Sequence, residues 1–205
     1  MRREISEGRI LAMRDRGVTP WKPSKAQLLA AHKKVVPDLI AKNLIVLFAG
    51  INPGLYTAAI GRHFGRPGNR FWPALYGGGF TPRVFSPFEN SLLLELGFGI
   101  TNIVERATAR ADELTDEELR AGGKRLAAKV RRWRPTVVAF VGIGPYRIVS
   151  GIKDAGVGLQ KEPFGGSYAW VLPNPSGLNA HYLPAALARL FGELRVWAVA
   201  RHGRG

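Results

Sequence analysis

Three separated stretches of this chain are almost continuously apolar, and they constrain the fold more than any other feature. They are LIVLFAG at 44–50, TVVAFVG at 136–142 and SYAWVLP at 167–173. A strand that is apolar throughout must be covered on both faces, as strands of parallel sheets are. These runs therefore predict a parallel sheet buried between two layers of helices. Residues 99–104 and the segment around Phe80 are weaker strand candidates.

Helical patterns lie between the apolar runs. Thr115 and Glu118 form a capping box, and the apolar residues that follow share one helical face until Pro135 ends the pattern. A similar stripe runs from Leu183 to Leu194, and Ser24 can cap a short helix at 25–34. The alternation predicts a three-layer α/β/α sandwich with a mainly parallel central sheet. We expect one domain at 24–205, preceded by a basic arm at 1–23.

The charge of the chain predicts an anionic partner. The 205 residues include 30 basic and 15 acidic ones, a net charge of +15, which is typical of proteins that bind nucleic acid. No apolar run is long enough to span a bilayer, and the N-terminus carries no apolar signal core. We therefore expect no membrane partner and, in a prokaryote, a cytoplasmic location near the nucleoid.

The composition also argues against a metal site. The absence of cysteine excludes disulfides, iron–sulfur clusters and cysteine-ligated zinc. The four histidines show no paired ligand spacing; they are His32, His63, His181 and His202.

Ligands of open α/β sheets bind beyond the carboxyl ends of the strands, where three loops of this chain stand out. GIGP at 142–145 holds only an isolated G-x-G and reads best as a plain strand-to-helix turn. GINPG at 50–54 places the amide of Asn52, both donor and acceptor, in a loop stiffened by proline. An Asx turn without catalytic function is the alternative interpretation of Asn52. NPSGLNAH at 174–181 is the third loop.

The segment after GINPG interleaves arginines with aromatic residues. Arg62, Arg66 and Arg70 can hold phosphates, and an aromatic face can stack on an unpaired base. Phe64 lies between glycines and is the better stacking candidate. A helix that opens near Asn69 accounts for three further apolar residues as core: Phe71, Trp72 and Leu75.

Four motifs in this order resemble the mismatch-specific uracil-DNA glycosylase and thymine-DNA glycosylase family. They are GINPG, HFGRPGNRFW, GITNIVERAT and LPNPSGL, and the similarity runs from about Leu44 to about Leu194. The resemblance implies the uracil-DNA glycosylase fold without a cofactor. It further implies a monomer that acts on double-stranded DNA carrying a G·U or related mismatch, initiating base excision repair.

The resemblance also assigns roles to individual positions. Asn52 matches the catalytic asparagine that positions the hydrolytic water. The implied base pocket comprises Ile51, Gly54, Thr57, His63, Phe64, Asn69 and Asn102. The implied DNA wedge and backbone contacts comprise Asn174, Ser176, Gly177, Leu178 and Asn179, with Leu178 as the wedge itself. Two positions depart from relatives: Ala180 stands where some bacterial members carry arginine, and Asn102 stands where relatives vary.

Two other function classes fit parts of the pattern. A non-catalytic nucleic-acid-binding module would use the same arginines and aromatics, but it does not need the amide of GINPG. A nucleotide-binding enzyme acting on small molecules would explain the glycine-rich loops. It would not explain the net charge of +15 or the wedge-like NPSGL. The sequence thus favours a monofunctional glycosylase and leaves its range among uracil, thymine and ethenocytosine open.

Overall fold

The computed structural model describes residues 19–177 and 181–203 and contains one five-stranded sheet. The sheet has the order β2-β1-β3-β5-β4. The strands are β1 (Val46–Gly50), β2 (Phe98–Asn102), β3 (Val137–Val141), β4 (Gly158–Leu159) and β5 (Tyr168–Leu172). All neighbouring pairs are parallel except β4 with β5, so the carboxyl ends of four strands meet at one edge.

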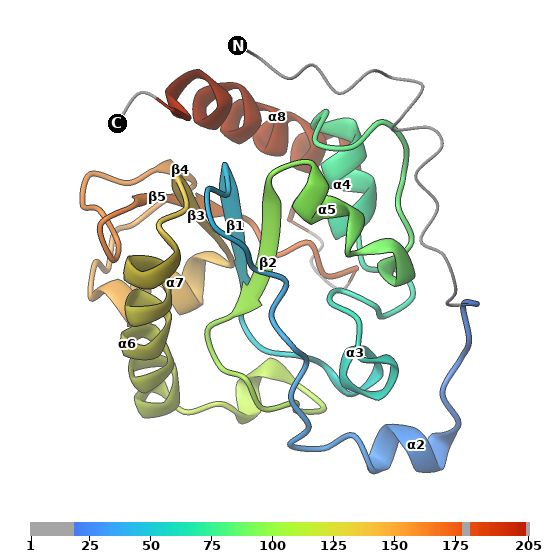
Figure 1. The fold of residues 1–205 in the computed structure, drawn as a ribbon. Helices are drawn as coiled ribbons and strands as arrows, with labels where there is room; N and C mark the ends of the chain where they lie inside the picture. The colour runs from blue at the N-terminus through green and yellow to red at the C-terminus, as the bar shows by residue number, and fades with distance from the viewer. Residues whose placement is uncertain (1–18, 178–180, 204–205) are drawn as a thin grey trace.

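Helices cover both faces of the sheet and give the three-layer α/β/α sandwich that the sequence predicts (Figure 1). The α-helices are α2 (Lys25–Leu29), α3 (Leu55–Ile60), α4 (Phe71–Gly77), α5 (Leu92–Glu95), α6 (Asp116–Trp133), α7 (Ile143–Ser150) and α8 (Pro184–Arg201). Two short 3-10 helices are η1 (Pro87–Glu89) and η2 (Ala111–Glu113). None of the helices in 19–177 and 181–203 is long and apolar enough to cross a membrane.

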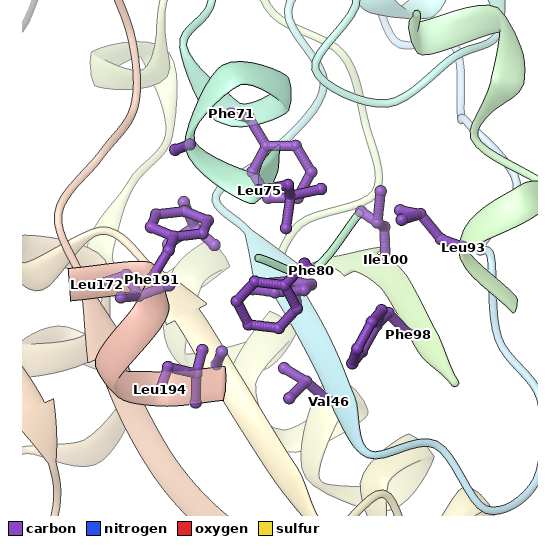
Figure 2. Close-up of a cluster of buried hydrophobic side chains, with 14 of the residues drawn as sticks. Val46, Phe71, Leu75, Phe80, Leu93, Phe98, Ile100, Leu172, Phe191 and Leu194 are labelled. Atoms are coloured by element: carbon purple, nitrogen blue, oxygen red, sulfur yellow. The ribbon is translucent and has the colours of Figure 1, made fainter. Parts of the chain in front are cut away.

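Two hydrophobic cores lie on opposite faces of the sheet. One packs α4, α5 and α8 against the sheet, and Figure 2 shows the rings of Phe71, Phe80, Phe98 and Phe191 meeting there. The other packs α6 and α7 against the opposite face of β1, β3 and β5. Successive side chains of a strand point to opposite faces, so each apolar run supplies both cores at once. The three runs are strands for this reason.

Helix α6 begins and ends where its sequence predicts. The Thr115 side chain accepts a hydrogen bond from the Glu118 amide, and the Glu118 carboxylate accepts one from the Thr115 amide. The helix ends at Trp133, and Arg134 closes it in the left-handed conformation, with a φ of 50°, before Pro135. This helix carries Glu118 to the site described below.

Three local predictions are wrong. The helix predicted at 25–34 ends at Leu29, because residues 33–35 leave it to pair with residues 106–107. The segment around Phe80 is not a strand; it is a loop after the glycines that end α4, and its ring packs into the core. Leu183 is not in the buried stripe of α8, since it is the N-cap and is 71% exposed.

The predicted arm is only partly described. Residues 19–24 have no regular secondary structure, and residues 1–18 lie outside the described part of the chain.

Candidate active site

A cavity of about 730 Å³ opens at the carboxyl edge of the parallel strands. Its walls come from the loop after β1, from α3, from the 61–69 loop, from the ends of β2 and β3, and from the loop after β5. The predicted catalytic residue, Asn52, lines it together with the residues predicted for the base pocket: Ile51, Gly54, Thr57, His63, Phe64, Asn69 and Asn102. Asn174 and Ser176 of the predicted wedge loop also line it. The parallel topology thus brings segments more than 120 residues apart in the chain to one cavity.

The amide of Asn52 is held in one orientation. Its Nδ2 donates to the Arg106 carbonyl oxygen at 3.1 Å and to Thr108 Oγ1 at 2.7 Å. Thr108 Oγ1 donates its own proton to the Arg110 carbonyl oxygen at 2.7 Å, so it must accept from Asn52. Nδ2 is thereby fixed, and Asn52 Oδ1 is left without a donor among the described residues. The partly buried amide therefore offers Oδ1 as a hydrogen-bond acceptor to the cavity, and Oδ1 does not form the hydrogen bond of an Asx turn.

An ion pair braces the loop that holds Asn52. The Arg106 guanidinium donates to both carboxylate oxygens of Glu118, at 2.6 and 2.9 Å. This pairing, together with the Thr115 amide, holds the pKa of Glu118 at about 2. A bidentate pair restricts the position of Arg106, whose carbonyl oxygen receives Asn52 Nδ2. Helix α6 therefore supports the site without lining it.

The ring of His63 is buried and neutral. Its Nε2 lies 2.9 Å from the Pro37 carbonyl oxygen, which can only accept, so the proton is on Nε2. Burial lowers the pKa of His63 below its ordinary 6.5. Nδ1 is then an acceptor, and Asn102 Nδ2 faces it at 3.5 Å. His63 thereby favours the orientation of the Asn102 amide in which Nδ2 faces the imidazole. The Asn102 Oδ1 then lies against Gly50, where a Cβ added to the glycine would be 2.7 Å from it.

Phe64 is a half-buried aromatic wall of the cavity. Its ring stacks on that of Phe71 with centroids 3.8 Å apart and an interplanar angle of 15°. Its backbone has a φ of 51°, in the left-handed region that a bulky residue rarely adopts. The strain is offset by the stacking contact beneath the ring. Phe64 therefore joins the pocket to the core, whereas Phe71, Trp72 and Leu75 are core residues as predicted.

Two of the predicted pocket residues brace the loops around it. Thr57 Oγ1 accepts a hydrogen bond from the buried Gly65 amide at 3.1 Å. Asn69 Oδ1 accepts one from the Phe71 amide at 2.9 Å, at the start of α4. Both side chains line the cavity and also hold the 61–69 loop in place.

The loop after β5 is clamped to the start of α4. The Arg70 guanidinium donates to the carbonyl oxygens of Ser176 and Tyr182, both at 2.6 Å, and the Arg70 amide donates to the Pro175 carbonyl oxygen. Asn174 Oδ1 accepts from the Ser176 amide at 3.0 Å. Arg70 therefore has a structural use in place of the phosphate contact considered from the sequence. Gly177 packs on Gly68, whereas Leu178, Asn179 and Ala180 lie outside the described residues.

Several lining residues were not foreseen from the sequence, chiefly Thr108, Arg110 and Asp112. Thr108 ends the motif GITNIVERAT, so the motif itself carried a signal for it. Arg110 pairs with Asp112 at the cavity mouth, while Arg66 makes no ion pair within the described residues. No group of three or more possible metal ligands occurs within 19–177 and 181–203.

The fold and this pocket define an α/β/α domain with a cavity at the carboxyl edge of its sheet. The profile of the Uracil DNA glycosylase superfamily matches residues 37–195, and the chain belongs to this superfamily. The fold is similar to the solution NMR structure of a candidate uracil DNA glycosylase from Methanosarcina acetivorans. The TM-score is 0.52 and the identity 17%, over 80% of this chain and 98% of that one. Membership in the superfamily supports a DNA glycosylase activity.

Proposed function

We propose that this protein is a monofunctional DNA glycosylase that hydrolyses the N-glycosidic bond of uracil mispaired with guanine in double-stranded DNA. The observation that carries the proposal is the fixed amide of Asn52. Both its donors are used by Arg106 and Thr108, so the remaining Oδ1 can orient a water molecule. A protein that only binds nucleic acid has no use for this arrangement.

The pocket requires that the base leave the duplex. An enzyme that acts on a base inside a stacked duplex must extrude the nucleotide, at a cost of a few kcal/mol that is lowest for a mismatched base. Phe64, supported from behind by Phe71, offers an aromatic face to the extruded ring. The loop at 174–177 lies at the mouth, and the adjoining Leu178 would fill the vacated space. These features favour a mispaired pyrimidine as the substrate.

The reaction breaks the bond between the anomeric carbon and N1 of uracil. The base leaves with the electron pair as an anion, and positive charge develops on the sugar. Backbone amides near Ile51 and Phe64 are candidates to stabilise the leaving base. Water held by Asn52 Oδ1 adds to the anomeric carbon and loses its proton to solvent, because an amide is too weak a base to take it. We therefore expect slow turnover.

The residues of the pocket favour a hydrolytic step over a lyase step. None of the described residues that line the cavity is a lysine, so no amine is placed for a Schiff base. Borohydride trapping of a covalent enzyme–DNA adduct would contradict this part of the proposal.

The test is single-turnover excision on duplexes that carry G·U, A·U or G·T and on single-stranded uracil DNA. Wild type should cleave G·U fastest, and Asn52→Ala should lose excision while still binding the duplex. Gln160→Ala removes an amide outside the pocket and should retain full excision. Wild type that binds DNA in a salt-dependent way but excises no base would leave a non-catalytic binding module instead.

A further inference from the structure

A second cavity lies at the opposite edge of the sheet, at the amino ends of the parallel strands. It has a volume of about 1040 Å³. It lies between the C-terminal end of α8 and the segments that precede β1, β3 and β5. In Figure 1 the arrowhead of β2 points toward the other edge of the sheet, the carboxyl edge. None of the residues that line it also lines the Asn52 pocket. We call it the basic cleft; its charged residues are Arg131, Arg134 and Arg201, and His202 also lines it.

The charges of the basic cleft are not balanced by acidic groups. No aspartate or glutamate occurs among the described residues that line it. Within the described part of the chain, none of its three arginines forms an ion pair, although Arg83 and Arg106 each pair with a glutamate. The Arg201 guanidinium lies 3.8 Å from the centroid of the Trp197 ring, which holds it in place. Three like charges around one cavity repel one another, and a bound anion would relieve the repulsion.

The cleft also contains unused backbone donors. Phe164 and Ser167 exchange backbone hydrogen bonds, so Gly165 and Gly166 form the tip of a tight turn with positive φ at both residues. The amides of these two glycines donate to no acceptor in the described residues. Backbone N–H groups and guanidinium forks together are the donors that proteins use for phosphate oxygens. A position in the last turn of a helix accounts for Arg131 and for Arg201 separately, but it does not explain why both line one cavity together with this turn.

The position of the cleft decides which anion it can hold. Strands of five residues separate the two edges of the sheet by about 16 Å. A straight duplex that presents a base to the Asn52 pocket lies across the carboxyl edge, so its backbone cannot reach the amino edge. We propose that the basic cleft binds the phosphodiester backbone of a second DNA segment, so that one protein molecule can bridge two duplexes. This site is independent of the proposed glycosylase reaction.

The experiment measures energy transfer between two undamaged duplexes, one with a donor dye and one with an acceptor, at increasing protein concentration. Wild type should bring the duplexes together, and Arg131→Gln/Arg201→Gln should lose most of that signal. The control is Lys124→Gln/Arg125→Gln, which removes the same charge from exposed positions of α6 outside the cleft. The salt slope of bridging should fall by about 1.8 in the cleft variant, because each phosphate that an arginine neutralises contributes about 0.9 to that slope. Single-turnover excision should be unchanged in both variants. Because energy transfer is measured on undamaged duplexes, a protein without glycosylase activity would give the same transfer signal.

Four results would overturn the proposal. Equal loss of transfer in the cleft and control variants would show an effect of total charge. Absence of bridging by wild type that binds a single duplex would exclude a second DNA site, even if calorimetry showed that the cleft binds inorganic pyrophosphate. Competition by polyglutamate as effective as that by unlabelled duplex would assign the cleft to an acidic polypeptide. If Arg131→Gln/Arg201→Gln is destabilised, Arg134→Asn replaces it in the experiment, because asparagine tolerates the left-handed backbone of that position. Unchanged energy transfer in Arg134→Asn would refute the cleft as the second DNA site.

Discussion

Replacing Thr108 by valine tests whether the orientation of the Asn52 amide matters for catalysis. Valine keeps the shape of threonine but removes the hydroxyl that accepts from Asn52 Nδ2 at 2.7 Å and donates to the Arg110 carbonyl oxygen. A donor left unsatisfied costs about 1–3 kcal/mol. Asn52 Nδ2 keeps its second acceptor, the Arg106 carbonyl oxygen at 3.1 Å, so the loss should lie in the lower part of that range.

The expected effect is a slower chemical step. A penalty of about 1–2 kcal/mol on the oriented amide corresponds to a reduction of about 5- to 30-fold in the rate constant for excision. Affinity for the duplex should be unchanged, because Thr108 fixes Asn52 without supplying a cationic contact to phosphate. The assay is single-turnover excision from a G·U duplex with enzyme in excess, alongside equilibrium binding of the same duplex.

Thr108→Ser is the matched control, since it retains the hydroxyl and should stay within about 2-fold of wild type if the hydrogen bond is what matters. Urea denaturation of all three proteins separates a local effect from partial unfolding. A folded Thr108→Val protein that excises uracil as fast as wild type would refute the argument that this hydroxyl holds the catalytic amide.

Three further predictions concern packing and pH. Gly122→Ala should destabilise the fold by about 1–3 kcal/mol in urea denaturation, because its Cβ would lie 2.3 Å from a backbone carbonyl oxygen; Gly144→Ala meets open space and should be neutral or stabilising by up to about 1 kcal/mol. Because the pKa of His63 is lowered, the unfolded chain binds a proton below pH 6.5 that the folded protein does not. The free energy of unfolding should therefore fall as the pH drops through 6.5, and it should fall less in His63→Gln. The pKa of Glu118 is about 2, against an ordinary 4.5, so the stability that its carboxylate contributes is present above pH 4.5 and is lost as the pH falls to 2. In Glu118→Gln the free energy of unfolding should depend less on pH between 4.5 and 2.

Much of the architecture could be predicted from local patterns. The apolar runs at 44–50, 136–142 and 167–173 contain β1, β3 and β5, and the capping box at Thr115 marks the start of α6. Parallel pairing then places the loops after the strands at one edge, so Asn52, Asn102 and Asn174 could be expected near one another. The errors arose where tertiary contacts override a local pattern. The helix predicted at 25–34 is cut short by pairing with residues 106–107, and the run around Phe80 fills the core without forming a strand.

The sequence by itself determined the three layers, the buried faces of the strands and the position of the asparagine loop, because these follow from residues close together in the chain. Only the tertiary structure decided what each polar group of the site does. One of the two acceptors that orient Asn52 is Thr108, 56 residues away, and the carbonyl oxygen of Tyr182 that Arg70 binds is 112 residues away. Hydrogen bonds are short-ranged and directional, so pairs this distant in the chain become partners only when the sheet has brought their loops to one edge.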